Sequence, residues 1–303
     1  MTYSIVARDD RTGLMGVACQ SQALAVGSSV PWVLPGHGVI ATQSMGEPMY
    51  GDLGLDALRG GLTASEALTA LRSVDPFPER RQVAMVDGAG RFDAYTGEAC
   101  VAEAGHRFGD GCVALANMVA SPAVWEAMTE AWERTAGSMP ERLMAALHAA
   151  EAEGGDFRGR RSAAISVARA SRTGRPWRDW LVNLRVDEDD DPVGKLDRLV
   201  KRSDRYHKAV EAFDLALAGE TDSALELLDG LPEPDPAVDP DVSLWASIVL
   251  SLAGRESEAQ RLLAGLATSA PQFLEVARRF SDVGLIPDGR PFEALVARLA
   301  EDR

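Results

Sequence analysis

The stretch Thr2-Tyr3-Ser4-Ile5-Val6-Ala7-Arg8 follows Met1 directly, and the interpretation of the first two hundred residues starts from it. It alternates and is rich in β-branched side chains, a pattern typical of a β-strand. Because Thr2 is small, we expect Met1 to be removed in the cell, which leaves a free α-amino group. Such a threonine carries a nucleophilic hydroxyl and an amine of pKa about 7.7–8.0, a base that works near neutral pH. The simpler interpretation is a chain that merely starts with a threonine and a strand, and the stretch by itself favours it.

The composition is that of a globular protein with about two domains. The chain has 303 residues, of which 46% are hydrophobic and 25% charged. The net charge is −15, from 31 basic and 46 acidic residues, which argues against nucleic acid and against an anionic membrane surface as partners. This negative net charge is compatible with a small substrate.

The sequence predicts a cytoplasmic protein. The first residues lack a basic start followed by an apolar core, and no apolar run approaches the roughly 20 residues that span a bilayer. The three cysteines, Cys19, Cys100 and Cys112, have no metal-type spacing, and the histidines are scattered. We therefore expect free thiols, no bound metal and no cofactor.

Lysine is rare, which limits the chemistry of the first part of the chain. The only lysines are Lys195, Lys201 and Lys208. Any catalytic scheme in the first 194 residues must therefore work without a lysine.

Blocks of strands alternate with pairs of helices in the first two hundred residues. Alternating or apolar segments predict strands at residues 2–8, 14–21, 24–33, 38–42, 82–87, 91–96, 105–108, 112–119, 163–169 and 180–186. Amphipathic segments predict helices at residues 51–60, 65–73, 122–136 and 140–152. Thr63 and Glu66 form a capping-box pattern before the second of these helices. This order predicts an α+β fold in which helices cover antiparallel sheets.

The remainder of the chain is predicted to be helical and to form a separate module. Helical segments are expected at residues 192–218, 223–230, 242–253, 256–267, 272–283 and 292–300. Prolines at positions 232, 234, 236 and 240 predict a stiff linker between the second and third of them. We place the domains at residues 1–204 and 205–303.

Several short motifs, taken in order, resemble the family called domain of unknown function 1028. They are Thr2 to Asp9, Thr12 to Ala18, Ala41-Thr42-Gln43 with Tyr50-Gly51, Arg80 to Ala84, and Gly154-Gly155-Asp156 with Gly159-Arg160 and Ser162 to Ala164. The resemblance covers about residues 1–200. The tail is similar to a helical domain often fused to this family and labelled peptidoglycan-binding, a role that conflicts with the absence of an export signal.

The resemblance implies membership of the N-terminal nucleophile (Ntn) hydrolase superfamily. It therefore implies a four-layer αββα sandwich in which the mature N-terminal residue attacks an amide bond. Two positions depart from the family pattern: Glu47 precedes Pro48 where an asparagine is common, and Arg161 stands where a glutamine often precedes the serine. If either position contacts substrate, the specificity of this chain differs from that of its relatives.

The candidate catalytic residues are Thr2, Asn117 and Asp156. The Thr2 hydroxyl would attack a carbonyl while its amine takes the proton. The Asn117 side chain and the backbone N–H groups of residues 154–162 are candidate donors to the resulting oxyanion. An arginine such as Arg160, or backbone amides, would hold the amine pKa down. The expected substrate-binding residues are Gln43, Glu47, Gly155, Arg160 and Ser162.

Each candidate also has a purely structural interpretation. Asn117 could cap a turn at the end of its strand, and Asp156 could form an Asx-turn in a glycine-rich loop. Gly155 is suited to a special backbone angle, and Gln43 could be a polar residue at a strand end.

Two functions remain open on the sequence alone. The first is hydrolysis of a small, non-peptide amide through Thr2. The alternative is a catalytically inactive binding or scaffold protein that acts through its helical tail. Small cytosolic enzymes of this shape commonly form two-fold homodimers, and the sequence neither supports nor opposes such an assembly.

Overall fold

A computed structural model of the chain describes residues 2–286 and 290–301. The chain divides into two compact units, one ending at Val200 and one beginning at Lys201. Each unit is described by itself below.

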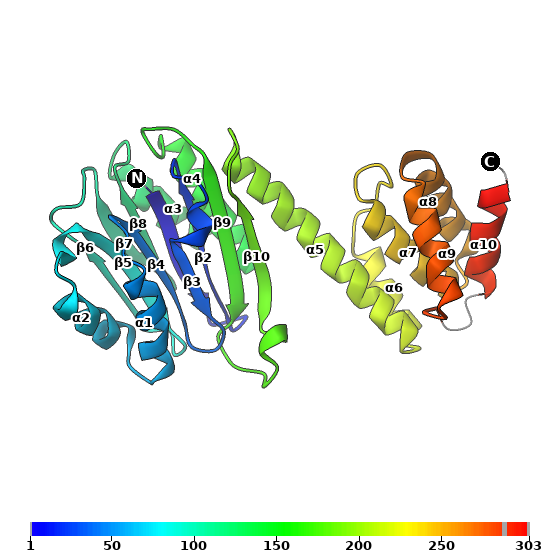
Figure 1. The fold of residues 1–303 in the computed structure, drawn as a ribbon, viewed down its shortest axis with the longest axis horizontal. Coiled ribbons are helices and arrows are strands. Elements are labelled where there is room, and N and C mark those ends of the chain that lie inside the picture. The colour runs from blue at the N-terminus through cyan, green and yellow to red at the C-terminus, as the bar shows by residue number, and fades with distance from the viewer. Residues whose placement is uncertain (1, 287–289, 302–303) are drawn as a thin grey trace. The chain divides into compact units, whose positions relative to one another are not determined.

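The first unit contains two antiparallel sheets (Figure 1). Among the described residues, one sheet has the strand order β10-β9-β2-β1-β8-β7 and the other β3-β4-β5-β6. The strands of the first sheet are β1 (Thr2–Asp9), β2 (Leu14–Ser21), β7 (Gly105–Gly109), β8 (Cys112–Asn117), β9 (Ser162–Arg169) and β10 (Trp180–Val186). Those of the second are β3 (Pro31–Leu34), β4 (Gly38–Ser44), β5 (Arg81–Asp87) and β6 (Phe92–Thr96).

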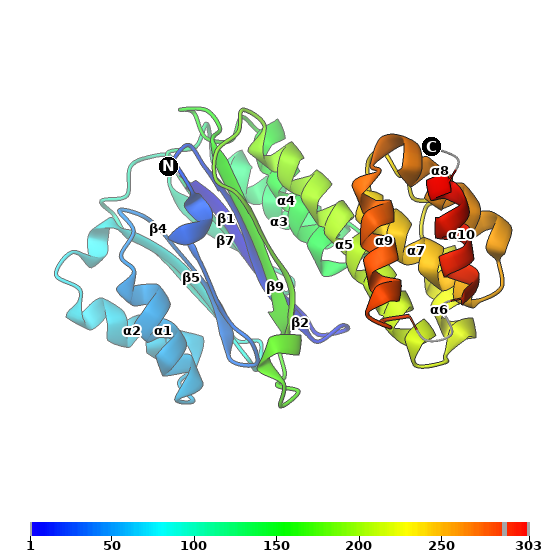
Figure 2. The same cartoon turned by 45° about the vertical axis from the view of Figure 1, so that its right-hand side comes forward.

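Helices pack on the outer faces of both sheets. Figure 2 shows α1 (Met49–Arg59) and α2 (Ala64–Val74) beside β4 and β5, and α3 (Ala123–Arg134) and α4 (Met139–Ala152) on the far side of β1. The first residues of α5 (Pro192–Leu217) join α3 and α4, since Val193, Leu196 and Val200 belong to the same buried cluster.

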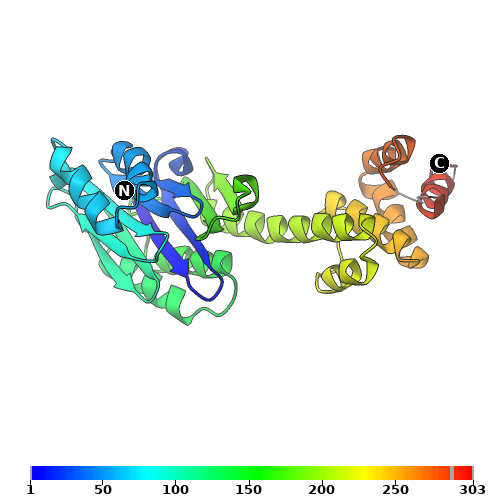
Figure 3. The same ribbon diagram turned by 90° about the horizontal axis from the view of Figure 1, so that it is seen from below.

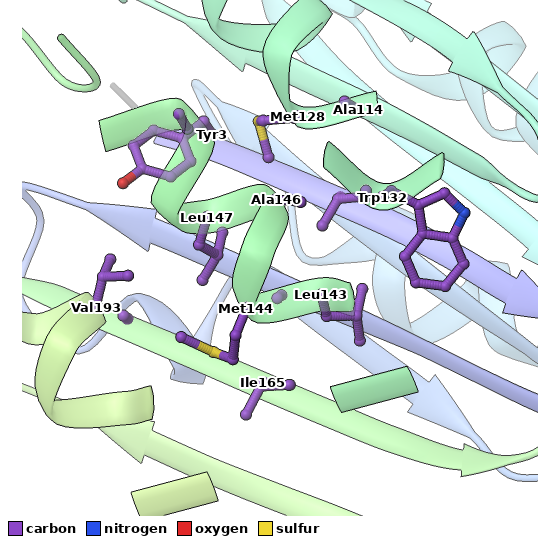
Figure 4. Close-up of a cluster of buried hydrophobic side chains, with 14 of the residues drawn as sticks. Tyr3, Ala114, Met128, Trp132, Leu143, Met144, Ala146, Leu147, Ile165 and Val193 are labelled. Carbon is purple, nitrogen blue, oxygen red and sulfur yellow. The ribbon is translucent and has the colours of Figure 1, made fainter. Parts of the chain in front are cut away.

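Strand β1 lies near the middle of the first sheet and is buried on both faces. Tyr3, Ile5 and Ala7 belong to the buried cluster formed with α3 and α4. Figure 4 shows Tyr3 in this cluster together with Leu147 and Trp132. The intervening side chains point towards the second sheet, because successive side chains of a strand alternate between faces. A strand buried on both faces has no solvent side, so any polar side chain on it must find partners inside the protein.

An apolar layer fills most of the space between the two sheets. It includes Val6 of β1, Val17 and Cys19 of β2, Val39 of β4 and Val86 of β5, all almost fully buried. We call this cluster the intersheet core. Burial of such side chains contributes about 1.5–3 kcal/mol each to folding, so it holds the sheets together.

The second unit is helical. It comprises the rest of α5 with α6 (Thr221–Asp229), α7 (Pro240–Leu252), α8 (Glu256–Ser269), α9 (Gln272–Asp282) and α10 (Arg290–Glu301), coloured from yellow-green to red in Figure 3. Trp245 stacks on Phe280 with ring centroids 5.6 Å apart. No helix in the described part of the chain combines the length and the apolar character that crossing a membrane requires.

Most predicted helices and strands are confirmed, with ends that differ by at most two residues. The capping box is also present, with Thr63 Oγ1 accepting from the Glu66 N–H and a Glu66 carboxylate oxygen accepting from the Thr63 N–H. The strand predicted at residues 24–33 is wrong. A 3₁₀ turn at Val26–Ser28 and the short strand β3 take its place, because the N–H groups of Ala25 and Val26 donate to Asp187 and Ser162 instead of to a neighbouring strand.

A buried ion pair explains two residues of the family-like motifs. Arg81 of β5 donates to both carboxylate oxygens of Asp75, at 2.8 and 3.1 Å, and the Tyr50 hydroxyl donates to the same carboxylate at 3.0 Å. Arg81 also donates to the Met45 carbonyl at 2.6 Å, in the loop after β4.

Gly51, next to Tyr50 in the same motif, has a packing role. A side chain at this position would collide with the ring of Trp32, so only glycine lets α1 approach β3 this closely.

The Asp75–Arg81 pair makes stability depend on pH. The hydrogen bonds from Arg81 hold the pKa of Asp75 down at about 2. A carboxyl whose pKa is lower in the folded than in the unfolded chain contributes stability above its unfolded pKa of about 3.9, and the contribution is lost as the pH falls towards 2. The shift corresponds to about 2 kcal/mol.

We predict that Asp75→Asn lowers the free energy of unfolding at pH 7 by roughly 3 kcal/mol, because it leaves Arg81 as a buried cation without a counter-charge. The variant should also lose part of the acid dependence between about pH 4 and pH 2. Urea unfolding at a series of pH values measures both effects. The control is Asp56→Asn, which breaks an exposed 2.8 Å pair with Arg59 and should cost less than about 1 kcal/mol. Equal losses in the two variants would contradict the prediction.

Candidate functional site

A row of polar side chains crosses the first sheet at the end where β1 begins. Thr2 lies opposite Asn117 on β8 and opposite Ser21 on β2. Ser21 in turn lies opposite Ser162 on β9. All four are buried, and each is an even number of residues from a member of the intersheet core, so all four face the second sheet. We call them the first polar row.

A matching row crosses the second sheet. Gln43 on β4 lies opposite Gln82 on β5, and Gln82 lies opposite Thr96 on β6. Each of them also lies an even number of residues from a side chain in or packed against the intersheet core. They therefore share its face and point towards the first sheet. We call them the second polar row. The apolar layer between the sheets thus gives way to a polar one at this end.

Three buried carboxamides connect the rows. Gln82 Nε2 donates to the backbone carbonyls of Gly105 and Ala116, at 3.1 and 2.8 Å. Its Oε1 accepts from Gln43 Nε2 at 2.8 Å and from Asn117 Nδ2 at 2.9 Å. Both of these donors also reach the carbonyl oxygen of Thr2, at 3.1 and 3.4 Å. The first residue of β1 is therefore held from both sheets.

The Thr2 hydroxyl lies within this network. Thr2 Oγ1 donates to Ser21 Oγ at 3.1 Å, and Ser21 Oγ also accepts from the Ala23 N–H at 3.0 Å. Two residues further along β1, on the same face, the Ser4 hydroxyl donates to Gln43 Oε1. The hydroxyl of Thr2 is thus held in a defined direction at the end of the intersheet layer.

The arrangement disagrees with the predicted role of Asn117 as an oxyanion donor. Both N–H groups of its side chain are used inside the protein, one towards Gln82 and one towards Thr2. Its Oδ1 is buried and has no hydrogen-bond partner among the residues that the structure describes. Asn117 therefore offers an acceptor at the site where a donor was expected.

The loop of residues 154–162 also offers fewer donors than predicted. The backbone N–H groups of Gly154, Gly155, Arg158, Gly159 and Arg161 already donate to protein oxygens. Because those N–H groups serve to shape the loop, they are not free to hold an oxyanion.

Asp156 joins three segments around the first polar row. Its carboxylate accepts from the Gln22 N–H at 3.0 Å, next to Ser21, and from the Arg158 N–H at 2.8 Å. Its backbone forms a bridge with Val119, two residues after Asn117. Asp156 is 5% exposed and is paired with Arg158 at 3.2 Å. In this structure it positions the loop.

Ser162 has a comparable positioning role. Its hydroxyl donates to the Ala23 carbonyl at 2.6 Å and accepts from the Val26 N–H at 2.9 Å. These two bonds hold the turn that follows β2. Its contacts thus place Ser162 beside the site without directing its hydroxyl at Thr2.

Arg160 and Gly155 lie towards α4. Arg160 pairs with Glu151 at 3.1 Å, and Glu151 accepts the hydroxyl of Tyr3, whose side chain points away from the polar rows. Burial, together with Glu151, raises the pKa of Tyr3. Gly155 has φ +46°, and its N–H donates to the Ala150 carbonyl at the end of α4. Arg160 is therefore engaged by a carboxylate on the helix side, which disagrees with its predicted effect on the Thr2 amine.

Glu47 lies in the loop between β4 and α1. Its Oε1 accepts from the Met49 N–H at 3.3 Å, and its carbonyl accepts from Thr42 Oγ1 at 3.4 Å. It is half-buried and follows Gln43 by four residues. The structure thus places it near the end of the second polar row, in contact with its own loop.

Backbone strain accompanies the polar rows. Ser44 directly follows Gln43 with φ +71°, Met118 directly follows Asn117 with φ +53°, and Ala25 has φ +53° in the turn held by Ser162. Residues other than glycine rarely adopt this left-handed conformation, and such strain is concentrated at functional sites.

Exposed apolar side chains border the same end of the sheets. Leu24 follows Ser21 by three residues, Met45 follows Gln43 by two, and Phe157 is next to Asp156. A fourth exposed apolar residue, Val101, lies at the same end, because its backbone carbonyl accepts from the N–H of Met118, next to Asn117, at 3.0 Å. These side chains are between 50% and 63% exposed. We call them the apolar rim.

Sequence reasoning missed Gln82, Ser21 and Ser4. A usable signal was present, because each is a polar residue at an inward position of an otherwise apolar strand. Cys19 and Cys112 are unsuited to nucleophilic attack, since burial raises the pKa of each thiol to about 12. Within the described residues, no group of three or more His, Cys, Asp or Glu side chains could hold a metal ion.

Comparison with known proteins identifies the family of this chain. The chain is similar to a crystal structure of protein SPO2555 from Silicibacter pomeroyi, assigned to DUF1028, with 32% identity and a TM-score of 0.60, over 67% of this chain and 88% of that one. The comparison with curated proteins finds no match. Residues 2–196 match the model of the "Family of unknown function (DUF1028)". The chain therefore belongs to the DUF1028 family.

Proposed function

We propose that this protein is an Ntn-type amidohydrolase that cleaves a small amide through Thr2 after removal of Met1. The observation that carries the proposal is the position of Thr2. It is the first residue of the central strand β1, and its hydroxyl lies in a buried polar layer between two sheets. A nucleophile and a base would then share one residue in a preorganised surrounding.

The arrangement of sheets and helices supports the proposal. Two antiparallel sheets share a core, and each carries helices on its outer face. We assign this arrangement to the four-layer αββα sandwich of the Ntn hydrolases. Fold likeness alone does not establish activity, so the proposal depends on the chemistry of Thr2.

In the proposed reaction, Thr2 Oγ1 attacks the carbonyl carbon of the amide. Its proton passes to the α-amine of Thr2, directly or through one water, and then to the leaving nitrogen as the C–N bond breaks. The acyl group remains on Oγ1 as an ester, which a water molecule hydrolyses in a second step. The hydrogen bond to Ser21 orients Oγ1. Because no lysine precedes Lys195, the α-amine is the natural base.

The apolar rim favours a substrate with an apolar substituent. The polar rows would orient the amide, while Leu24, Met45 and Phe157 offer exposed apolar surface at the same end of the sheets. Ligand sites commonly combine apolar contacts with a few polar groups that fix the orientation. We therefore propose a small amide that carries an apolar acyl group.

Thr2 and the removal of Met1 give the most direct test of the proposed function. The intact mass of the protein purified from cells should be lower than that of the full sequence by one methionine. Thr2→Ala should then reduce amide hydrolysis by roughly a thousandfold or more, because it removes the nucleophile. Thr2→Ser is the matched control, since it keeps both the hydroxyl and the α-amine and should retain activity. A retained Met1, or an active Thr2→Ala protein, would exclude this mechanism.

The acyl group of the substrate gives a further test. Across a series of acyl amides, kcat/KM should rise with acyl length by up to about fourfold per methylene, which corresponds to about 0.8 kcal/mol. Phe157→Ser should flatten this dependence. Trp177→Ser is the control, because Trp177 is 75% exposed but lies on the connection between β9 and β10. The same flattening in both variants would remove the apolar rim from the proposal.

A further inference from the structure

The orientation of the Asn117 side chain follows from the groups around it. Backbone carbonyls only accept hydrogen bonds, so Gly105 and Ala116 require Gln82 to present its Nε2 to them. Gln82 Oε1 then points at Asn117, which must present its Nδ2 in return, at 2.9 Å. Turning the Asn117 amide over would direct its Oδ1 at two acceptors, Gln82 Oε1 and the Thr2 carbonyl.

This orientation leaves a buried acceptor without a donor. Asn117 is 0% exposed, and within residues 2–286 and 290–301 its Oδ1 has no hydrogen-bond partner. The other carboxamide oxygens of the two polar rows are already engaged, Gln43 Oε1 by the Ser4 hydroxyl and Gln82 Oε1 by two N–H groups. A buried polar atom without a partner is unfavourable and calls for an explanation.

Removal of Met1 would create a donor beside this acceptor. The new α-ammonium group carries three N–H bonds and begins a strand whose first residue, Thr2, is 6% exposed in the full chain. Acceptors within the protein would therefore stabilise its charge. Thr2 lies directly opposite Asn117, whose Nδ2 is already 3.4 Å from the Thr2 carbonyl oxygen. The free acceptor and the new donor are therefore on paired residues.

We propose that Asn117 Oδ1 accepts a hydrogen bond from the α-amino group of mature Thr2 and holds this group beside Oγ1. The proposal rests on the proposed function only in requiring a free Thr2 amine. Asn117 is then a positioning residue: it holds the base and exchanges no proton. An acceptor favours the charged form of the amine, so Asn117 raises the amine pKa.

The electrostatic surroundings make this effect measurable. No charged side chain belongs to either polar row. The charged neighbours include the Asp156–Arg158 pair on the loop that contacts Gln22, and the Glu151–Arg160 pair on the α4 side with Tyr3. Glu47 lies near the end of the second polar row. Arg81 neighbours Gln82 in sequence but points to the opposite face of β5. In the described chain the Asn117 side chain bonds to Gln82 and Thr2, so its replacement removes no bond to a charged group.

The experiment is a pH titration of the Thr2 α-amine in intact, ¹⁵N-threonine-labelled protein, followed by NMR without any substrate. Asn117→Ala should lower the amine pKa, because the acceptor is lost. Asn117→Asp should raise it, because the acceptor becomes an anion. The control is Ser166→Ala on β9, which removes a hydroxyl bonded to Asn183 and should leave the pKa unchanged. A merely structural role for Asn117 would not move the pKa in opposite directions.

A pKa that neither Asn117 variant moves would overturn the proposal. If the variants fail to fold, a crystal structure of the mature wild-type protein decides the question. A distance from Thr2 N to Asn117 Oδ1 within about 3.2 Å supports the proposal, and one beyond about 3.5 Å overturns it. Failure of the proposed function can be distinguished from failure of this proposal. A retained Met1, detected by mass, would exclude the Asn117 contact and the proposed function together. If Asn117 binds the Thr2 amine but the protein cleaves no amide, only the proposed function is excluded.

Discussion

The structure of the first unit depends on one constraint: polar side chains buried between two sheets must satisfy one another. At most positions the intersheet layer is apolar, and burial alone holds the sheets together. At the Thr2 end, Gln43, Gln82 and Asn117 replace the apolar side chains. Each carboxamide there has a fixed direction, because backbone carbonyls set the orientation of Gln82 and Gln82 sets that of the other two. Because breaking these hydrogen bonds would leave further buried polar groups unpaired, the network favours the observed register of the two sheets at this end.

The surrounding loops follow from the same constraint. Strands β4 and β8 end directly after their carboxamides, with Ser44 and Met118 in left-handed conformations. Asp156 then ties the loop before β9 to the residue after Ser21, and Ser162 holds the turn at Val26. On the outer side, the Asp75–Arg81 pair fixes the loop after Gln43 through the Met45 carbonyl. Strain at individual residues is tolerated because several segments share these contacts.

The elements of the fold could be predicted from the sequence, whereas the geometry of the site could not. Periodicity located nearly every helix and strand, and the capping pattern at Thr63 gave one helix start. The segment after Ser21 was mistaken for a strand because its apolar residues carry no sign of the side-chain and loop oxygens that capture its N–H groups. The motifs single out Thr2 and Gln43, which the structure brings together, but the direction of a carboxamide depends on residues distant in sequence. Asn117 was therefore assigned as a donor, although its partners lie at Gln82 and Thr2.

The neutrality of the two polar rows has a consequence for the chemistry. A nearby cation would lower the pKa of an amine and a nearby carboxylate would raise it, whereas a neutral surrounding leaves burial and hydrogen bonds to set the value. For the free amine of the proposed mature protein, burial of Thr2 would disfavour the charged form and the acceptor Asn117 Oδ1 would favour it, so the two effects would oppose each other. Such an amine would both take and return a proton, which is what the proposed reaction requires of it. Under the proposed function, a site without lysine needs Thr2 to supply the base, and the carboxamides that hold the Thr2 carbonyl would keep that base in place.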